Sequence, residues 1–157
     1  MKKTIAKKDV AKFLGRLLKD YIVYAPTRVA NYVSFREITS PKDVISDCLV
    51  TQEPPKGIFL PQTEVLFSYE KTDDGIELHP AETVERERIV WGIRPCDAQA
   101  VLVQDAVFDT PDARDVYYLD KRGKTPLVGI GCNKPLSTCL VRLLLPRPRV
   151  QGHARQG

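Results

Sequence analysis

Two short apolar segments, separated by a stretch of helical character, constrain the fold of this chain more than any other feature. The first runs from Ile89 to Ile93 and the second from Leu127 to Ile130. Continuous apolar runs of this length are typical of strands that are buried on both faces of a parallel sheet. The intervening stretch is long enough for a right-handed crossover, which makes the two strands parallel. The sequence therefore predicts a mixed α/β (α+β) fold, a single domain with a parallel strand-helix-strand unit in its C-terminal half.

Local patterns predict the remaining elements. Apolar side chains recur at helical spacing near the start of the chain, and runs rich in Val, Tyr and Phe follow them. The expected elements are a surface helix across Val10 to Leu18, two strands within 21–38 joined by a turn at 25–27, a short helix beginning at Pro61, a turn at 72–75, a short strand at 76–78, a helix capped by Asp97 that ends before Phe108, and a helix that starts at 110–112 and runs to Gly123.

Charge is distributed unevenly along the 157 residues. The net charge of +4 comes from four arginines in the last part of the chain, and without them 20 basic residues face 20 acidic ones. A neutral body gives no indication of nucleic-acid binding. The charged N-terminus lacks the apolar run of a secretory signal, and no stretch approaches the roughly 20 apolar residues of a membrane span. We therefore expect a cytoplasmic protein without membrane insertion, in which thiols stay reduced.

Three of the four cysteines follow the two buried segments. Cys96 comes shortly after the first, and Cys132 and Cys139 come after the second. Because the carboxyl ends of parallel strands meet at one edge of a sheet, we expect these thiols to lie in one crevice. Clustered reduced thiols favour a metal or iron–sulfur site, with Cys96, Cys132 and Cys139 as its ligands. Cys48 lies outside any ligand spacing and is interpreted as structural or incidental.

Neighbouring residues suit this chemistry. A cysteine beside Arg94 at the start of a helix lies in a field that lowers its pKa, so Cys96 is predicted to be ionised. Gly129 and Gly131 let the backbone turn closely around a bulky inorganic group. The same glycines begin a dinucleotide fingerprint, but Lys134 stands where its third glycine belongs, which disfavours a nucleotide site.

Three motifs resemble one known family: Phe59 to Phe67 (FLPQTEVLF), Gly92 to Ala98 (GIRPCDA), and Gly131 to Cys139, in which Pro135 and Thr138 recur. They resemble the iron–sulfur β-subunit family of cytoplasmic hydrogenase and sulfhydrogenase, which also includes the A subunit of anaerobic sulfite reductase. The resemblance covers roughly Tyr24 to Cys139. It implies that residues 1–139 form the N-terminal, cysteine-bearing domain of an iron–sulfur electron-transfer subunit. It also implies a 4Fe-4S cluster on Cys96, Cys132 and Cys139, and partner subunits of a hydrogenase or a sulfite or sulfur reductase complex.

The chain departs from the family pattern after Cys139. The family continues as Thr-Cys-x-Cys, which places a fourth cysteine where this sequence has Val141. Residues 140–157 form an atypical basic tail without acidic residues, expected to be disordered, and the family's ferredoxin-like domain is missing. We hypothesise a reading-frame shift as the origin of both losses, because Leu140-Val141-Arg142 can be encoded as CTT GTG CGT, which reads Leu-Cys-Val one nucleotide further along.

Two other interpretations stay open. A zinc-binding or apo docking module, without redox activity, is the alternative to an electron-transfer subunit, since zinc accepts three thiolates and one further ligand. A thiol-redox enzyme is disfavoured because no Cys-x-x-Cys motif is present. His79 and His153 suggest no nucleophile system, so no catalytic residue is predicted.

Overall fold

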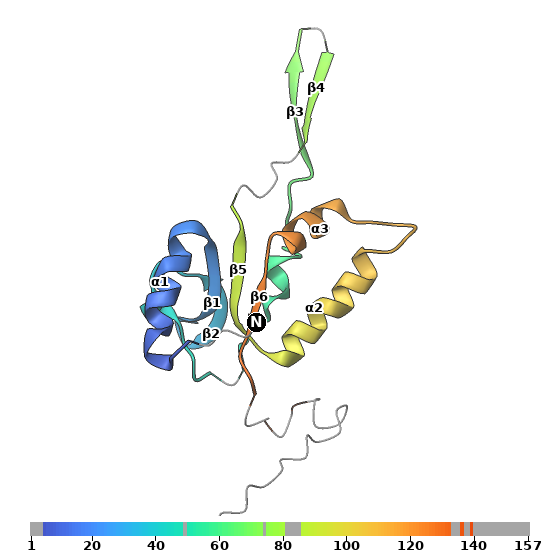
Figure 1. Cartoon of the computed structure of the whole chain (residues 1–157). Helices are drawn as coiled ribbons and strands as arrows, with labels where there is room; N and C mark the ends of the chain where they lie inside the picture. Colours follow the sequence, from blue (N-terminus) through green and yellow to red (C-terminus); the bar gives the residue numbers. More distant parts are fainter. Residues whose placement is uncertain are drawn as a thin grey trace, which may run out of the picture.

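A computed structural model describes residues 5–48, 50–73, 75–80, 86–132, 136 and 139 (Figure 1). The elements, in chain order, are the 3-10 helix η1 (Lys7–Asp9), α1 (Val10–Asp20), β1 (Ile22–Val29), β2 (Tyr32–Glu37), the 3-10 helices η2 (Pro41–Asp43) and η3 (Pro55–Ile58), β3 (Phe67–Thr72), β4 (Gly75–Pro80), β5 (Arg88–Ile93), α2 (Pro95–Phe108), α3 (Val116–Gly123) and β6 (Leu127–Gly129). The tail at 140–157, including Val141, lies outside the described residues.

A four-stranded mixed sheet in the order β2-β1-β5-β6 forms the centre of the domain. β1 is antiparallel to β2 and parallel to β5, and β5 is parallel to β6. β5 and β6 are the two apolar segments, and α2 and α3 lie in the connection between them. The mixed α/β class and the parallel strand-helix-strand unit are therefore confirmed. None of the helices in the described ranges has the length and apolar character needed to cross a membrane.

The two faces of the sheet bury separate apolar clusters. On one face α1 contributes Leu14, which packs with Val23, Ala25, Ile38 and Ile89. On the other face α2 and α3 cover a cluster of six buried residues: Phe35, Phe59, Val90, Ile93, Val101 and Tyr118. Figure 1 shows this division, with α1 on one side of the strands and α2 and α3 on the other.

A β-bulge in β5 decides which face Ile93 covers. Strict alternation would place residue 93 with Ile89, on the α1 face. The pairing with β6 shifts between Trp91 and Ile93, and Gly92 has a φ of 81°. The extra residue turns Ile93 to the face of Val90, where it joins the cluster under α2.

Three boundaries differ from the sequence predictions. β1 runs through Pro26, and the turn expected at 25–27 lies instead at 30–31. Proline is tolerated there because the pairing of β1 with β5 ends at Tyr24, so no ladder bond from residue 26 to β5 is lost. α2 begins at Pro95 rather than after Asp97, since proline suits a first helical turn. α3 begins at Val116, because the Asp115 carboxylate caps it by accepting a hydrogen bond from the Tyr118 backbone N–H at 2.9 Å.

The segment around Pro61 also differs. Its expected helix is absent: residues 61–66 have no regular structure, and a 3-10 turn stands earlier, at Pro55–Ile58. Phe59 explains this placement, because its fully buried side chain anchors the chain in the core immediately after that turn. The following residues lead into β3, which forms a hairpin with β4 at the expected turn and strand. The hairpin projects away from the sheet in Figure 1.

Candidate metal centre

Cys96 and Cys132 lie at the same edge of the sheet. Cys96 is the second residue of α2, directly after β5, and Cys132 follows the end of β6 by three residues. Both are exposed. Since β5 and β6 are neighbouring parallel strands, their carboxyl ends carry the two thiols to one side of the domain.

Arg94 connects a third segment to this edge. Its Nη1 donates a hydrogen bond to the Gly131 carbonyl at 3.4 Å, and its Nη2 contacts the Cys48 carbonyl. One guanidinium group therefore bridges the residue beside Cys132 and the loop that carries Cys48. The same loop is attached to β1 by a hydrogen bond from the Ile45 N–H to the Pro26 carbonyl at 2.8 Å. Sequence spacing gave no indication of this position for Cys48, because the contact spans 46 residues of chain.

A charge on Cys139 is the smallest of the causes that raise the pKa of Cys96. Cys139 is half-buried and closes a turn in which its N–H donates to the Leu136 carbonyl at 3.1 Å. Residues 133–135, 137 and 138 of the third motif lie outside the described residues.

The predicted ionisation of Cys96 is wrong. Burial raises its pKa first, and the Asp97 carboxylate raises it further, while backbone N–H donors at 96 and 97 oppose the shift. The positive charge of Arg94 acts on Asp97 instead. Burial raises the pKa of Asp97, and Arg94 opposes part of that rise. The guanidinium hydrogen-bonds the carbonyls of Gly131 and Cys48, so its contacts are made to the loops rather than to the Cys96 thiol.

All four cysteines are free thiols. Within the described ranges, no group of three or more His, Cys, Asp or Glu side chains is arranged to hold a metal ion. Arg94 links the segments that carry Cys48 and Cys132, and Cys96 follows the neighbouring strand, but the four thiols are scattered and the described residues do not gather them into one ligand group.

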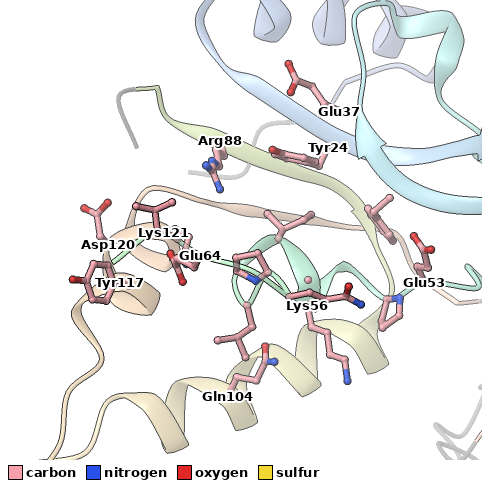
Figure 2. Close-up of a pocket in the computed structure, with 18 of the residues that line it drawn as sticks. Tyr24, Glu37, Glu53, Lys56, Glu64, Arg88, Gln104, Tyr117, Asp120 and Lys121 are labelled. Atoms are coloured by element: carbon pink, nitrogen blue, oxygen red, sulfur yellow. The ribbon is translucent and has the colours of Figure 1, made fainter. Parts of the chain in front are cut away.

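A cavity of about 1,700 Å³ lies away from the cysteines, on the α3 side of the sheet (Figure 2). Sequence reasoning did not find it, because its lining comes from β1, β2, the segment 53–65, the base of the hairpin, β5, α2 and α3. The motif at 59–67 supplies part of this lining through Leu60, Pro61, Gln62, Glu64 and Val65.

Five of the eight charged residues that line the cavity form ion pairs. Arg36 binds Glu53 at 2.8 Å, Lys121 binds Glu64, and Lys124 binds the lining residue Asp120 at 2.6 Å. Two polar atoms are buried without a hydrogen-bond partner among the described residues, Arg88 Nε and Gln104 Oε1. Figure 2 shows Arg88 entering from the sheet and Gln104 from α2 on the opposite side.

Comparisons with known proteins give no relative: no family model, no curated protein and no solved structure matches this chain.

Proposed function

We propose that this domain binds an iron–sulfur cluster through Cys96, Cys132 and Cys139, with Cys48 as the fourth thiolate. The observation that supports this most directly is the double contact of Arg94, which holds the Cys48 loop against the residue before Cys132. Cys48 is the one further cysteine in the chain, and four thiolates are the usual ligand set of a 4Fe-4S cluster.

The residues at the edge suit an inorganic cluster in three ways. Each thiolate of a cubane cluster binds a different iron, so its ligands need not converge on one point. Cys96 and Cys132 are exposed, and Cys48 and Cys139 are half-buried, so an incoming group can reach the first two thiols from solvent. Arg94 supplies a positive charge beside the site, which offsets the negative charge that four thiolates bring.

When bound, such a cluster accepts and donates single electrons, and the protein supplies its ligands, its charge environment and its exposure to solvent. Together with the resemblance to hydrogenase and sulfite reductase subunits, this chemistry supports a role as an electron-transfer subunit. Its partners in that role are the other subunits of a hydrogenase or of a sulfite or sulfur reductase complex. The chain's own part is to hold the cluster near the surface, where an electron can pass to a partner.

Anaerobic reconstitution with iron and sulfide tests the proposal. The wild-type chain should gain iron, acid-labile sulfide and a brown absorbance that dithionite bleaches. Cys132→Ala should abolish all three, and Cys48→Ser should lower the iron content severalfold. Ser46→Ala, an exposed change in the same loop, is the matched control and should retain full iron content.

Each failure has a separate meaning. If the wild-type chain stays colourless and binds zinc tightly at one ion per chain, the zinc-module interpretation replaces the electron-transfer role. If the cluster forms equally well in Cys48→Ser, the fourth ligand is wrong while the three-cysteine site stands. If iron is unchanged in Cys132→Ala, the whole site assignment is wrong.

A further inference from the structure

The solvent face of α1 carries a row of cations. The apolar side of this helix packs on the sheet through Leu14, so the opposite side faces solvent. Three cations follow one another along α1 at the spacing of a helical turn, and two more stand in η1 directly before it: Lys12, Arg16, Lys19, Lys7 and Lys8. All five are exposed, and none forms an ion pair with a residue that the structure describes.

Positive charge is concentrated in this part of the chain. The first 20 residues hold seven basic and two acidic side chains, whereas residues 21–139 hold 13 basic and 18 acidic ones. The overall balance of the body therefore combines a positive α1 region with a negative remainder. Charge that is separated in this way orients an approaching molecule and steers anionic groups towards α1.

A small hollow lies in the middle of the row. Asp9, Lys12, Phe13 and Arg16 line it, and its volume is about 210 Å³. Small-ligand sites have roughly 300–1,000 Å³, so this hollow suits one side chain rather than a whole ligand. Phe13 is 40% exposed and its ring lies 6.2 Å from that of Trp91. The Asp9 carboxylate precedes α1 but accepts no capping hydrogen bond.

We propose that this face of α1 docks an acidic segment of another protein, with one carboxylate side chain of that segment in the hollow. The carboxylate binds Lys12 and Arg16, the stem of its side chain lies on Phe13, and a peptide N–H or an amine of the partner meets Asp9. An acidic helix has the matching spacing, because carboxylates at i, i+4 and i+7 repeat as the three cations of α1 do. This docking does not depend on the cysteine site.

Two other polyanions fit this face less well. A bilayer binds an amphipathic helix through its apolar side, and that side of α1 is buried on the sheet. A phosphate backbone presents only acceptors, which leaves the Asp9 carboxylate without a donor, and beyond α1 it meets the net negative remainder of the body. A peptide carries donors and acceptors side by side, so it matches a hollow that contains both signs of charge.

The docking face begins at the thiol end of the domain. α1 ends at Asp20 and β1 begins at Ile22, so the helix turns back and runs antiparallel to β1. β1 is parallel to β5, and β5 is parallel to β6. The start of α1 therefore lies at the end of the sheet where Cys96 and Cys132 follow their strands. An acidic partner on this face would approach the domain from the end at which the proposed cluster exchanges electrons.

An immobilised helical peptide tests the proposal on the full chain. The peptide carries Glu at i, i+4 and i+7, and a second peptide with Gln at the same positions is its control. At low ionic strength the wild-type chain should bind the Glu peptide and not the Gln peptide, and added salt should weaken the binding. Lys12→Glu with Arg16→Glu should lower the affinity by about tenfold or more.

Two further variants separate the hollow from net charge. Lys56→Glu with Lys71→Glu changes the charge by the same amount at exposed lysines outside α1, and it should bind as the wild type does. Phe13→Ala leaves the charge unchanged and should weaken binding severalfold. Circular dichroism should show the same secondary structure in all variants.

Three results would overturn the proposal. The first is a wild-type chain that does not bind the Glu peptide at low ionic strength. The second is equal weakening by the two double variants, since net charge alone would then decide binding. The third is tighter binding to a DNA duplex or to phosphatidylserine vesicles that the α1 variant loses, which would assign the face to that anion. Iron content after reconstitution is read separately and should be unchanged in the α1 variant, so failure of docking is distinguishable from failure of the cluster site.

Discussion

Gly92 allows the sharpest test of how this sheet is built, through the substitution Gly92→Ala. Its φ of 81° lies in the left-handed region, where an alanine costs about 1–2 kcal/mol. A Cβ at this position would stand 3.2 Å from Pro26 Cδ and 3.3 Å from Ile130 Cδ1, closer than ordinary contacts. Crowding of this kind in a packed region costs about 1–3 kcal/mol. We therefore expect a loss of about 2–5 kcal/mol in the free energy of unfolding.

Gly129→Ala is the matched control on the neighbouring strand. Its Cβ would stand 3.6 Å from the Ile93 carbonyl oxygen, which is an ordinary contact, and its φ is not in the left-handed region. Reduced freedom of the unfolded chain then favours the variant, so stability should stay constant or rise by up to about 1 kcal/mol.

Urea unfolding monitored by far-UV circular dichroism measures both variants. The signal avoids Trp91, which neighbours the substituted residue. A loss below about 1 kcal/mol for Gly92→Ala, or equal losses for both variants, would contradict the argument that the bulge needs glycine. A change in the slope m of the Gly92 variant alone would instead indicate that the altered protein no longer unfolds in two states.

Three further changes follow from the site and its supports. Glu64→Gln leaves the Lys121 side chain, which is 7% exposed, as an unpaired buried cation, so it should lower the free energy of unfolding in urea by about 3 kcal/mol. Lys121→Met should cost less, because the Glu64 side chain that it leaves unpaired is 32% exposed and keeps contact with water. Equal costs for the two variants would refute this asymmetry. Burial and the hydrogen bond to Asp105 raise the pKa of Tyr118 well above its ordinary value. The neutral Tyr118 phenol therefore contributes its full stabilisation below about pH 10, and this contribution declines at higher pH, where the unfolded chain ionises. Tyr118→Phe should flatten that decline in thermal melts between about pH 9 and 11. Val141→Cys introduces the fourth cysteine that the resemblance to the iron–sulfur family implies, and on the proposed function it should raise the iron retained after reconstitution in the Cys48→Ser background. No gain there would argue against that resemblance at residue 141.

The central unit of the fold could be predicted because its signal is local. Ile89–Ile93 and Leu127–Ile130 are apolar without interruption, and the connection between them leaves few topologies. The face of the sheet on which Ile93 lies was not predicted, because it depends on the β-bulge between Trp91 and Ile93. The apolar run itself does not indicate that bulge. The position of the Cys48 loop could not be predicted for another reason, because Arg94 contacts it from a position 46 residues away in the sequence.

The cavity and the charge environment of Cys96 were beyond sequence reasoning in a similar way. A helix start beside an arginine indicated a lowered pKa, but the pKa of that thiol depends on burial and on the Asp97 carboxylate, neither of which spacing specifies. Residues 59–67 were recognised as a motif and then assigned the wrong local structure. Their function as a wall of the cavity depends on partners in β2, α2 and α3.

The order of strands in the sheet has a consequence for biosynthesis. β5 pairs with β1, which is synthesised well before β5, and with β6, which is synthesised after β5, α2 and α3. The edge of the sheet beside Cys96 and Cys132 is therefore complete only after β6 has left the ribosome. Until then Cys48 and Cys96 are free in a partly folded chain, open to oxidation and to stray copper or zinc. Insertion of the proposed cluster would therefore follow synthesis of this domain rather than accompany it, and on that proposal cells that make the chain quickly under air should accumulate it without metal.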